Sequence, residues 1–244
     1  MKKMTNIEFV NILKDIESQI PTSYMLGCFG WPATDHMIKR AVDRKDVNNS
    51  KYKAGAESIK NKGFMFDCVC LIKSILWGFN GDLNAVYGGA KYASNGVSDI
   101  GADQMIKECY NVSTDFNDIK IGCAVWLPGH IGVYIGDGQV IECTPKWSVS
   151  PGVKKTYLKN LGFEGSMSRS WTKWGFLPYL QYIDKVEKVE NENVEIPTYA
   201  QDAIQFFVDN HYLKGNGQAN YGLSEDMIRI LCIFYRLVKD KGMI

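Results

Sequence analysis

The sequence predicts an α+β protein in which N-terminal helices pack on an antiparallel sheet and a small helical module follows. Three observations support this fold class. Apolar residues recur at helical spacing in the first part of the chain, and the spacing becomes that of strands from residue 121. A charged segment without aromatic residues then precedes a tail with helical spacing. The 244 residues are enough for one good-sized domain and a small module.

Helices and loops alternate in the first part of the chain. Residues 6–20 have apolar side chains at helical spacing and are expected to form the first helix. Residues 33–63 are polar and are predicted to be loop with a short helix. A second helix is expected over 67–77 and a short one near 101–110, with a Gly-, Asn- and Tyr-rich loop over 78–100 between them.

Strand patterns dominate the next part. The segments GCAVWL, HIGVYI and QVIEC have the composition of strands and are separated by Pro-Gly and Gly-Asp-Gly. We expect the last two to pair as a hairpin around Gly136-Asp137-Gly138, because this loop suits the left-handed backbone of a tight turn. GFLPYLQYI, residues 175–183, is predicted to be the last strand.

The chain is predicted to divide into a main domain over 1–184, a linker over 185–196 and a helical module over 197–244. The module fits two helices, the second with a clear apolar stripe that includes Ile230 and Phe234. Two helices bury little surface alone. We therefore expect the module to pack on the main domain, on a third element, or on a copy of itself as a homo-oligomer.

Composition and charge exclude several kinds of partner. A formal net charge of +1 gives no electrostatic signal for nucleic acid or for an acidic membrane surface. No apolar run approaches the roughly 18 residues of a membrane span, so no membrane insertion is expected. The start, MKKMTNIEFVNILKDIE, lacks the continuous apolar region of a secretory signal peptide. We expect synthesis in the cytoplasm, with reduced cysteines.

The stretch FDCVCLIK holds the candidate nucleophile, Cys68. If Asp67 caps the helix that follows, Cys68 is its first residue, where the helix terminus and free backbone N–H groups favour a thiolate. Helical phase puts Cys68 on the stripe that faces the core and Cys70 on another face. Cysteines are more often packing residues than nucleophiles, so the assignment depends on finding a base.

A metal site and a disulfide are less favoured for this pair of thiols. Two cysteines at i and i+2, with one histidine about 60 residues later, match no common structural zinc pattern, and we expect neither a metal nor a cofactor. Cysteines so close on a helix point apart, which disfavours a disulfide. The total of seven is odd and matches no secreted disulfide scaffold.

His130 and Glu142 are the candidate base and orienting carboxylate. With a three-residue hairpin loop, Ile135 faces Gln139 and Gly132 faces Glu142, so His130 and Glu142 are diagonal neighbours on one face. Gly132 leaves the space between them empty. With a nucleophile they would complete a triad. A two-residue turn would shift the register by one and put Glu142 on the opposite face.

These motifs carry a resemblance to a known family. Asp67-Cys68-x-x-Leu71 followed by Gly129-His130-Ile131-Gly132-Val133-Tyr134-Ile135-Gly136 resembles the NlpC family of papain-like cysteine peptidases, which cut bacterial cell-wall peptides. The resemblance covers residues 5–184 and implies a papain-like core, with Cys68 as nucleophile and His130 as base. The third catalytic position is Glu142, where the family often has His, Asn or Gln.

A further motif extends the resemblance towards the amino terminus. Tyr24-Met25-Leu26-Gly27 resembles the family's Tyr-x-x-Gly stretch, which implies a role for Tyr24 near the oxyanion site. About 40 residues separate this stretch from Cys68, more than in many relatives. We interpret residues 33–63 as an insertion.

The resemblance implies a peptidoglycan hydrolase that cuts an amide bond in the stem peptide through a thioester, as an endopeptidase. The domain order is similar to that of phage or prophage endolysins, which a holin releases to the wall and whose tail targets the wall or self-associates. Two alternatives stay open: an N-acetylmuramoyl-L-alanine amidase, and a catalytically inactive wall-binding protein.

Four tryptophans are candidates for lining a substrate groove: Trp126, Trp147, Trp171 and Trp174.

Overall fold

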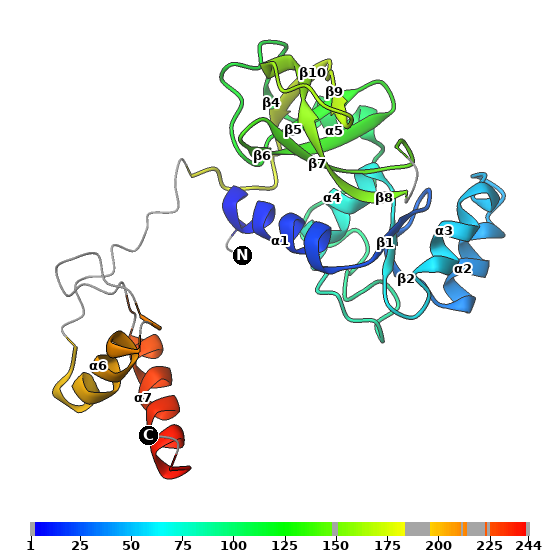
Figure 1. Ribbon diagram of the computed structural model, residues 1–244. Coiled ribbons are helices and arrows are strands. Elements are labelled where there is room, and N and C mark those ends of the chain that lie inside the picture. Colours follow the sequence, from blue (N-terminus) through cyan, green and yellow to red (C-terminus); the bar gives the residue numbers. More distant parts are fainter. Residues whose placement is uncertain are drawn as a thin grey trace. The chain divides into compact units, whose positions relative to one another are not determined.

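The computed structural model describes residues 3–147, 151–183, 196–210, 212–213, 223 and 225–242. The chain forms two compact units, Met1–Asp184 and Lys185–Ile244, whose helices and strands are drawn in Figure 1. No helix among these residues is long and apolar enough to cross a membrane. The expected linker over 185–196 lies outside the described residues except for its last position.

The first unit has the expected α+β class. Helices α1 (Asn6–Gln19), α4 (Cys68–Leu76) and α5 (Ala102–Glu108) pack against strands of one large, mostly antiparallel sheet (Figure 1). Within the described residues, this sheet has seven strands in the order β4–β10–β5–β6–β7–β8–β9. The strands are β4 Tyr110–Ser113, β5 Ala124–Leu127, β6 His130–Gly136, β7 Gln139–Thr144, β8 Gly152–Leu158, β9 Ser168–Arg169 and β10 Lys173–Phe176.

Helix α1 begins with a capping box. The Glu8 N–H donates to the Thr5 hydroxyl at 3.1 Å, and the Thr5 N–H donates to the Glu8 carboxylate at 2.7 Å. The helix packs on β7 and β8. Its buried stripe matches the predicted spacing and consists of Phe9, Val10, Leu13 and Ile16.

Helix α4 is buried on all sides. Asp67 is its N-cap, and one carboxylate oxygen accepts the Cys70 N–H at 2.7 Å. Every residue of the helix is buried, because α4 lies between β6 and β7 on one side and β2 (Phe29–Pro32) and α5 on others. The helix therefore begins where the sequence predicts and carries Cys68 into the centre of the unit.

A second, smaller sheet is not predicted by the sequence. In the described part of the chain it has the order β1–β3–β2, with β1 (Thr22–Tyr24) parallel to β3 (Phe64–Phe66) and β2 antiparallel to β3. Strands of three or four residues are too short to show a period. This sheet brings the chain before the insertion next to the chain just before α4.

The insertion over 33–63 contains more helix than expected. Helices α2 (Asp35–Val42) and α3 (Lys53–Ser58) lie side by side, with the short 3-10 helix η1 (Ser50–Tyr52) between them in sequence (Figure 1). The last predicted strand is also different, since β10 begins at Lys173 and ends at Phe176 rather than covering 175–183. Pro178 lacks the N–H that a continued ladder requires.

The turn between β6 and β7 differs from the predicted three-residue loop. It is the two-residue turn Asp137-Gly138, whose φ values of 50° and 67° match a type I′ turn. Gly136 therefore pairs with Gln139, and the expected pairing of Ile135 with Gln139 is wrong.

A β-bulge at Ile135 cancels the effect of this shorter turn. Beyond the bulge the register shifts back, so that Tyr134 pairs with Val140, as in the three-residue prediction. Glu142 consequently lies on the face of the sheet that carries His130. The predicted face is correct, although the turn that was expected to produce it is not the one observed.

The second unit contains α6 (Gln201–Asp209) and α7 (Glu225–Asp240), with the 3-10 helix η3 (Thr198–Ala200) before them. The buried residues between these elements are Ala200, Ala203, Ile204, Leu223, Ile228 and Cys232. Ile230 and Phe234, from the stripe seen in the sequence, lie outside this cluster and are 54% and 56% exposed. The helices thus meet through one side of α7 and leave an apolar side uncovered by α6.

Candidate active site

Cys68 lies where α4 meets the large sheet. It is the first residue of the helix, and β6 packs against this helix. The backbone N–H of Ile131 is close enough to the Cys68 thiol to lower its pKa, which places the sulfur beside β6. Because Ile131 follows His130 on β6, the thiol is next to the strand that carries the candidate base.

His130 and Glu142 are in direct contact. Nε2 of His130 lies 2.5 Å from Oε2 of Glu142, and the two side chains are 13% and 0% exposed. Strands β6 and β7 supply one residue each from the same face of the sheet. The structure therefore brings together the imidazole and carboxylate that the hairpin pattern predicts as partners.

Two residues that the sequence analysis missed hold the Glu142 carboxylate from the other side. Arg169 approaches as a fork, with Nε 3.1 Å from Oε1 and Nη2 2.9 Å from Oε2. The Thr156 hydroxyl donates to Oε1 at 2.8 Å. Oε1 therefore accepts hydrogen bonds from Thr156 and from Nε of Arg169, while Oε2 contacts His130 and forms an ion pair with Nη2 of Arg169.

Glu142 is held as a carboxylate by these contacts. Burial by itself raises the pKa of the carboxyl group, but the hydrogen bond and charge of His130, the charge of Arg169 and the hydrogen bond from Thr156 lower the pKa below its ordinary value. An ionised carboxylate can only accept, so we infer that His130 Nε2 carries the proton of their bond. In neutral His130 the basic nitrogen is then Nδ1.

Trp171 and Gly132 restrict the position of the imidazole. The Trp171 indole stacks on the His130 ring, with centroids 5.5 Å apart and planes at 14°. A Cβ added at Gly132 would lie 2.9 Å from the Val140 side chain and 3.2 Å from Glu142 Cβ. The absence of a side chain at Gly132 is therefore needed for the close packing of β6 and β7.

Tyr24 lies near the start of α4 despite the insertion. Strand β1 pairs Tyr24 with Phe66, and the Gly27 N–H donates to the second oxygen of Asp67 at 2.7 Å. Burial raises the pKa of Tyr24, and the nearby Cys68 charge raises it further. The Tyr24 hydroxyl is therefore a protonated donor close to the thiol.

The protonation state of Cys68 differs from the expected thiolate. Burial raises the pKa of Cys68 to about 12, and the charge of Asp67 adds to this. Donation from the Ile131 N–H acts in the opposite direction and is outweighed. The capping residue is part of the reason, because the carboxylate that satisfies the helix terminus also puts a negative charge beside the thiol. A base is needed to make Cys68 a nucleophile.

Cys70, the second thiol of the FDCVCLIK stretch, lies away from this centre. Cys70 is on the other side of α4, as predicted, where it lines a cavity, and burial raises the pKa of its thiol. The seven cysteines are all free. His36 is exposed, and His211 lies outside the described residues. Across the described ranges, no group of three or more His, Cys, Asp or Glu side chains is arranged to hold a metal ion.

Asp103 is a further residue that the sequence analysis missed. Its carboxylate accepts the Gly129 N–H at 2.7 Å and the Trp126 indole N–H at 2.8 Å, which fixes the turn just before His130. No local signal in the sequence marks Asp103, because its partners are 23 and 26 residues away in sequence.

Of the tryptophans considered for a groove, Trp171 is 3% exposed and lies against the imidazole of His130.

No family model and no curated protein sequence matches the chain. Among solved structures, NlpC1 and NlpC2 from Trichomonas vaginalis align with TM-scores of 0.37 and 0.33 at 13% and 14% identity, over 70% and 68% of this chain and 44% and 46% of theirs. The peptidoglycan hydrolase RipB from Mycobacterium tuberculosis aligns with a TM-score of 0.36 at 16% identity, over 71% of this chain and 66% of that one.

The chain thus spans less than two thirds of the length of each of these three proteins. Because every TM-score is below 0.5, the function proposed below rests on the residues of the site and not on these likenesses.

Proposed function

We propose that the protein is a cysteine-dependent peptidoglycan hydrolase that cuts an amide bond in the stem peptide of the bacterial cell wall, as an endopeptidase. The observation that carries the proposal is the buried His130–Glu142 pair, joined at 2.5 Å, beside a cysteine at a helix start. The substrate class comes from the resemblance of the motifs around Cys68 and His130 to the NlpC family.

In the proposed mechanism, Nδ1 of His130 takes the proton of the Cys68 thiol, and the thiolate attacks the carbonyl carbon of the amide. The Cys68 backbone N–H and the Tyr24 hydroxyl stabilise the oxyanion that forms. The C–N bond then breaks, and the imidazolium gives its proton to the leaving amine. Water attacks the thioester with His130 again as base, which releases the acid and restores the thiol.

Glu142 orients the imidazole and stabilises the imidazolium in both halves of this mechanism. Its own position is fixed by Arg169 and Thr156, so the carboxylate does not need to reorganise when the charge on His130 changes. The neutral thiol of Cys68 fits this scheme, because proton transfer to His130 and attack on the carbonyl can follow substrate binding.

A zymogram on purified cell walls tests the proposal. The wild-type chain should clear the walls, whereas Cys68→Ala, with an unchanged circular dichroism spectrum, should not. Full activity of Cys68→Ala would refute the mechanism. A wild-type chain that binds walls without cutting them would instead support the inactive wall-binding alternative.

Mass spectrometry of the released fragments identifies the bond. A new amino terminus within the stem peptide would mark an endopeptidase. Stems that begin with a free alanine amine, together with glycan strands without peptide, would mark the amidase, which can use the same three residues. The endolysin role that we propose is tested by expressing the chain in a host cell with and without a coexpressed holin and by measuring lysis.

A further inference from the structure

A cavity of about 520 Å³ lies on the side of α4 that carries Cys70. Asp67 and Val69, the residues on either side of Cys68 in sequence, both line it. The size is within the range of pockets that hold small ligands. The cavity thus borders the first turn of α4, and in the proposed complex a peptide that extends past Cys68 around this turn places one of its side chains or its terminus there.

Most of the charged groups in the cavity wall already have partners. Lys73 is 3% exposed and forms an ion pair with Asp99. Arg44 lies 2.5 Å from the carboxylate of Asp46. Both oxygens of Asp67 accept backbone N–H groups, at 2.7 Å each. Each of these groups therefore already has a hydrogen-bonding or ion-pair partner.

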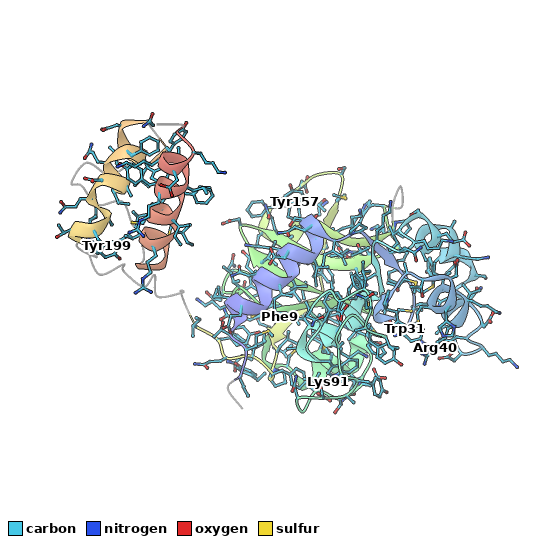
Figure 2. All side chains as sticks on the ribbon, turned by 90° about the horizontal axis from the view of Figure 1, so that it is seen from below. Phe9, Trp31, Arg40, Lys91, Tyr157 and Tyr199 are labelled. Carbon is cyan, nitrogen blue, oxygen red and sulfur yellow. The ribbon has the colours of Figure 1, made fainter. Side chains whose placement is uncertain are left out.

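Arg40 differs from the other charged residues of the wall. Its guanidinium carbon lies 4.7 Å from the centroid of the Trp31 ring and 5.9 Å from that of Tyr87, whose hydroxyl is 3.4 Å from Nη2. Figure 2 labels Trp31 and Arg40 next to each other. Within the described part of the chain, Arg40 takes part in none of the ion pairs.

We infer that Arg40 binds a free carboxylate of the stem peptide in this cavity and makes the enzyme selective for acidic over amidated stems. The aromatic rings hold the guanidinium plane, while its N–H edge can make a two-point contact with a planar carboxylate. This inference rests on the proposed function, because it names the substrates that the Cys68 site prefers. Arg40 belongs to α2, within the insertion, so the preference is a property of this segment of the chain.

The test uses two synthetic stem peptides that differ in one group, a carboxylate in the first and a carboxamide in the second. For the wild-type chain, kcat/KM should be about tenfold to hundredfold higher for the carboxylate peptide, the range expected for a hydrogen-bonded charge. Arg40→Gln should remove most of this preference by lowering kcat/KM for the carboxylate peptide only. Arg40→Lys should restore part of it, because lysine keeps the charge but lacks the fork.

The matched control is Lys39→Gln, which removes one charge from the same helix at an exposed side chain paired with Asp43. It should leave the preference unchanged. A wild-type chain without preference, or an Arg40→Gln protein with equal losses on both peptides, would overturn the inference.

A binding measurement separates this inference from the proposed function. The two peptides are titrated into the full-length Cys68→Ala chain and into Cys68→Ala combined with Arg40→Gln, with calorimetric detection. Arg40 should make the carboxylate peptide bind about tenfold tighter or more than the carboxamide peptide, even if the wild-type chain cuts neither. Equal affinities in the Cys68→Ala chain would overturn the role of Arg40, whereas tight selective binding without cleavage would overturn the hydrolase function alone.

Discussion

The two faces of α4 hold the same reactive group in different surroundings. Cys68 and Cys70 are both buried, at 7% and 4% exposed, and burial raises the pKa of both thiols. Cys68 faces β6, the strand of His130, whereas Cys70 faces the cavity and Lys73. Thiol acidity therefore does not separate the two cysteines. What separates them is a base on one side of the helix and not on the other.

The carboxylates on the two sides of α4, Glu142 and Asp99, differ in the kind of side chain that each contacts. Glu142 on the sheet side contacts the His130 imidazole, whose second ring nitrogen can take the proton of a thiol. Asp99 on the cavity side contacts Lys73, and although burial lowers the pKa of that ammonium group, nearby Cys70 and Asp99 raise it above its ordinary value. The ion pair on the cavity side thus stays charged, and the candidate general base lies on the sheet side.

The largest effect on kcat should come from replacing one of the two cysteines, Cys68. We expect Cys68→Ala to lower kcat by about 10⁴-fold or more, as for other lost nucleophiles. Cys70→Ala should leave kcat within a few-fold and cost about 1–2 kcal/mol of stability from the lost packing. Measurement of kcat and of urea unfolding for both variants tests the difference between the faces. Equal losses of activity in Cys68→Ala and Cys70→Ala would show that the two faces of α4 do not differ in function.

The next effect compares the two carboxylates. Glu142→Gln should lower kcat by about 10²–10⁴-fold, because an amide can donate to Nε2 and stabilise the wrong tautomer of His130. Asp99→Asn removes a carboxylate from the cavity side and should destabilise the fold through Lys73 while kcat stays close to wild type. If Asp99→Asn lowered kcat as much as Glu142→Gln, the cavity side would take part in the chemical step and not only in substrate binding.

A smaller effect should follow from removal of the Arg169 fork. Arg169→Gln should lower kcat by about tenfold to hundredfold and cost about 3 kcal/mol of stability at pH 7, since a buried carboxylate loses a charged partner. Because the folded pKa of Glu142 is lowered, its contribution to stability is present above the ordinary value of 4.5 and is lost as pH falls through the folded pKa.

In Arg169→Gln this contribution should be smaller and should disappear at a higher pH than in the wild-type chain. Urea unfolding between pH 3 and pH 7 measures both differences. An unchanged pH dependence of stability would show that Arg169 does not act on the ionisation of Glu142.

The last prediction concerns the rate of thiol alkylation and needs no substitution. With a pKa of about 12, Cys68 should react with iodoacetamide about tenfold faster for each unit of rising pH, without a plateau between pH 7 and pH 10. Peptide mapping by mass spectrometry follows Cys68 and Cys70 separately. A plateau near neutral pH for Cys68 would indicate a preformed thiolate and contradict the neutral thiol described above.

Parts of this arrangement can be predicted from sequence because they depend on local patterns. The cap at Asp67 and the helical phase of Cys68 and Cys70 involve neighbouring residues, and both agree with the structure. The prediction that His130 and Glu142 lie on one face of the sheet also agrees with the structure, but only because two shifts of the strand register cancel. A shorter turn moves the register by one position and the bulge at Ile135 moves it back, and a bulge leaves no reliable local pattern.

The rest depends on contacts across long stretches of the chain. Arg169 reaches Glu142 from 27 positions away, from a two-residue strand whose alignment with β8 no turn specifies. The neutral state of Cys68 depends on how completely the surrounding elements bury it, which helical spacing does not reveal. The short strands β1 and β3, which bring Tyr24 towards Cys68, are likewise defined by pairing rather than by period.

The stacking of Trp171 on His130 gives the site an optical signal. An imidazolium ring in contact with an indole quenches its fluorescence more strongly than a neutral imidazole does, and these two rings are nearly parallel, at 14°. The emission of Trp171 should therefore fall as His130 gains a proton and recover as it loses one. The difference spectrum between the wild-type chain and Trp171→Phe isolates this emission from that of the other tryptophans. The charge on the imidazole can thus be followed by light in a protein that carries no label and no substrate.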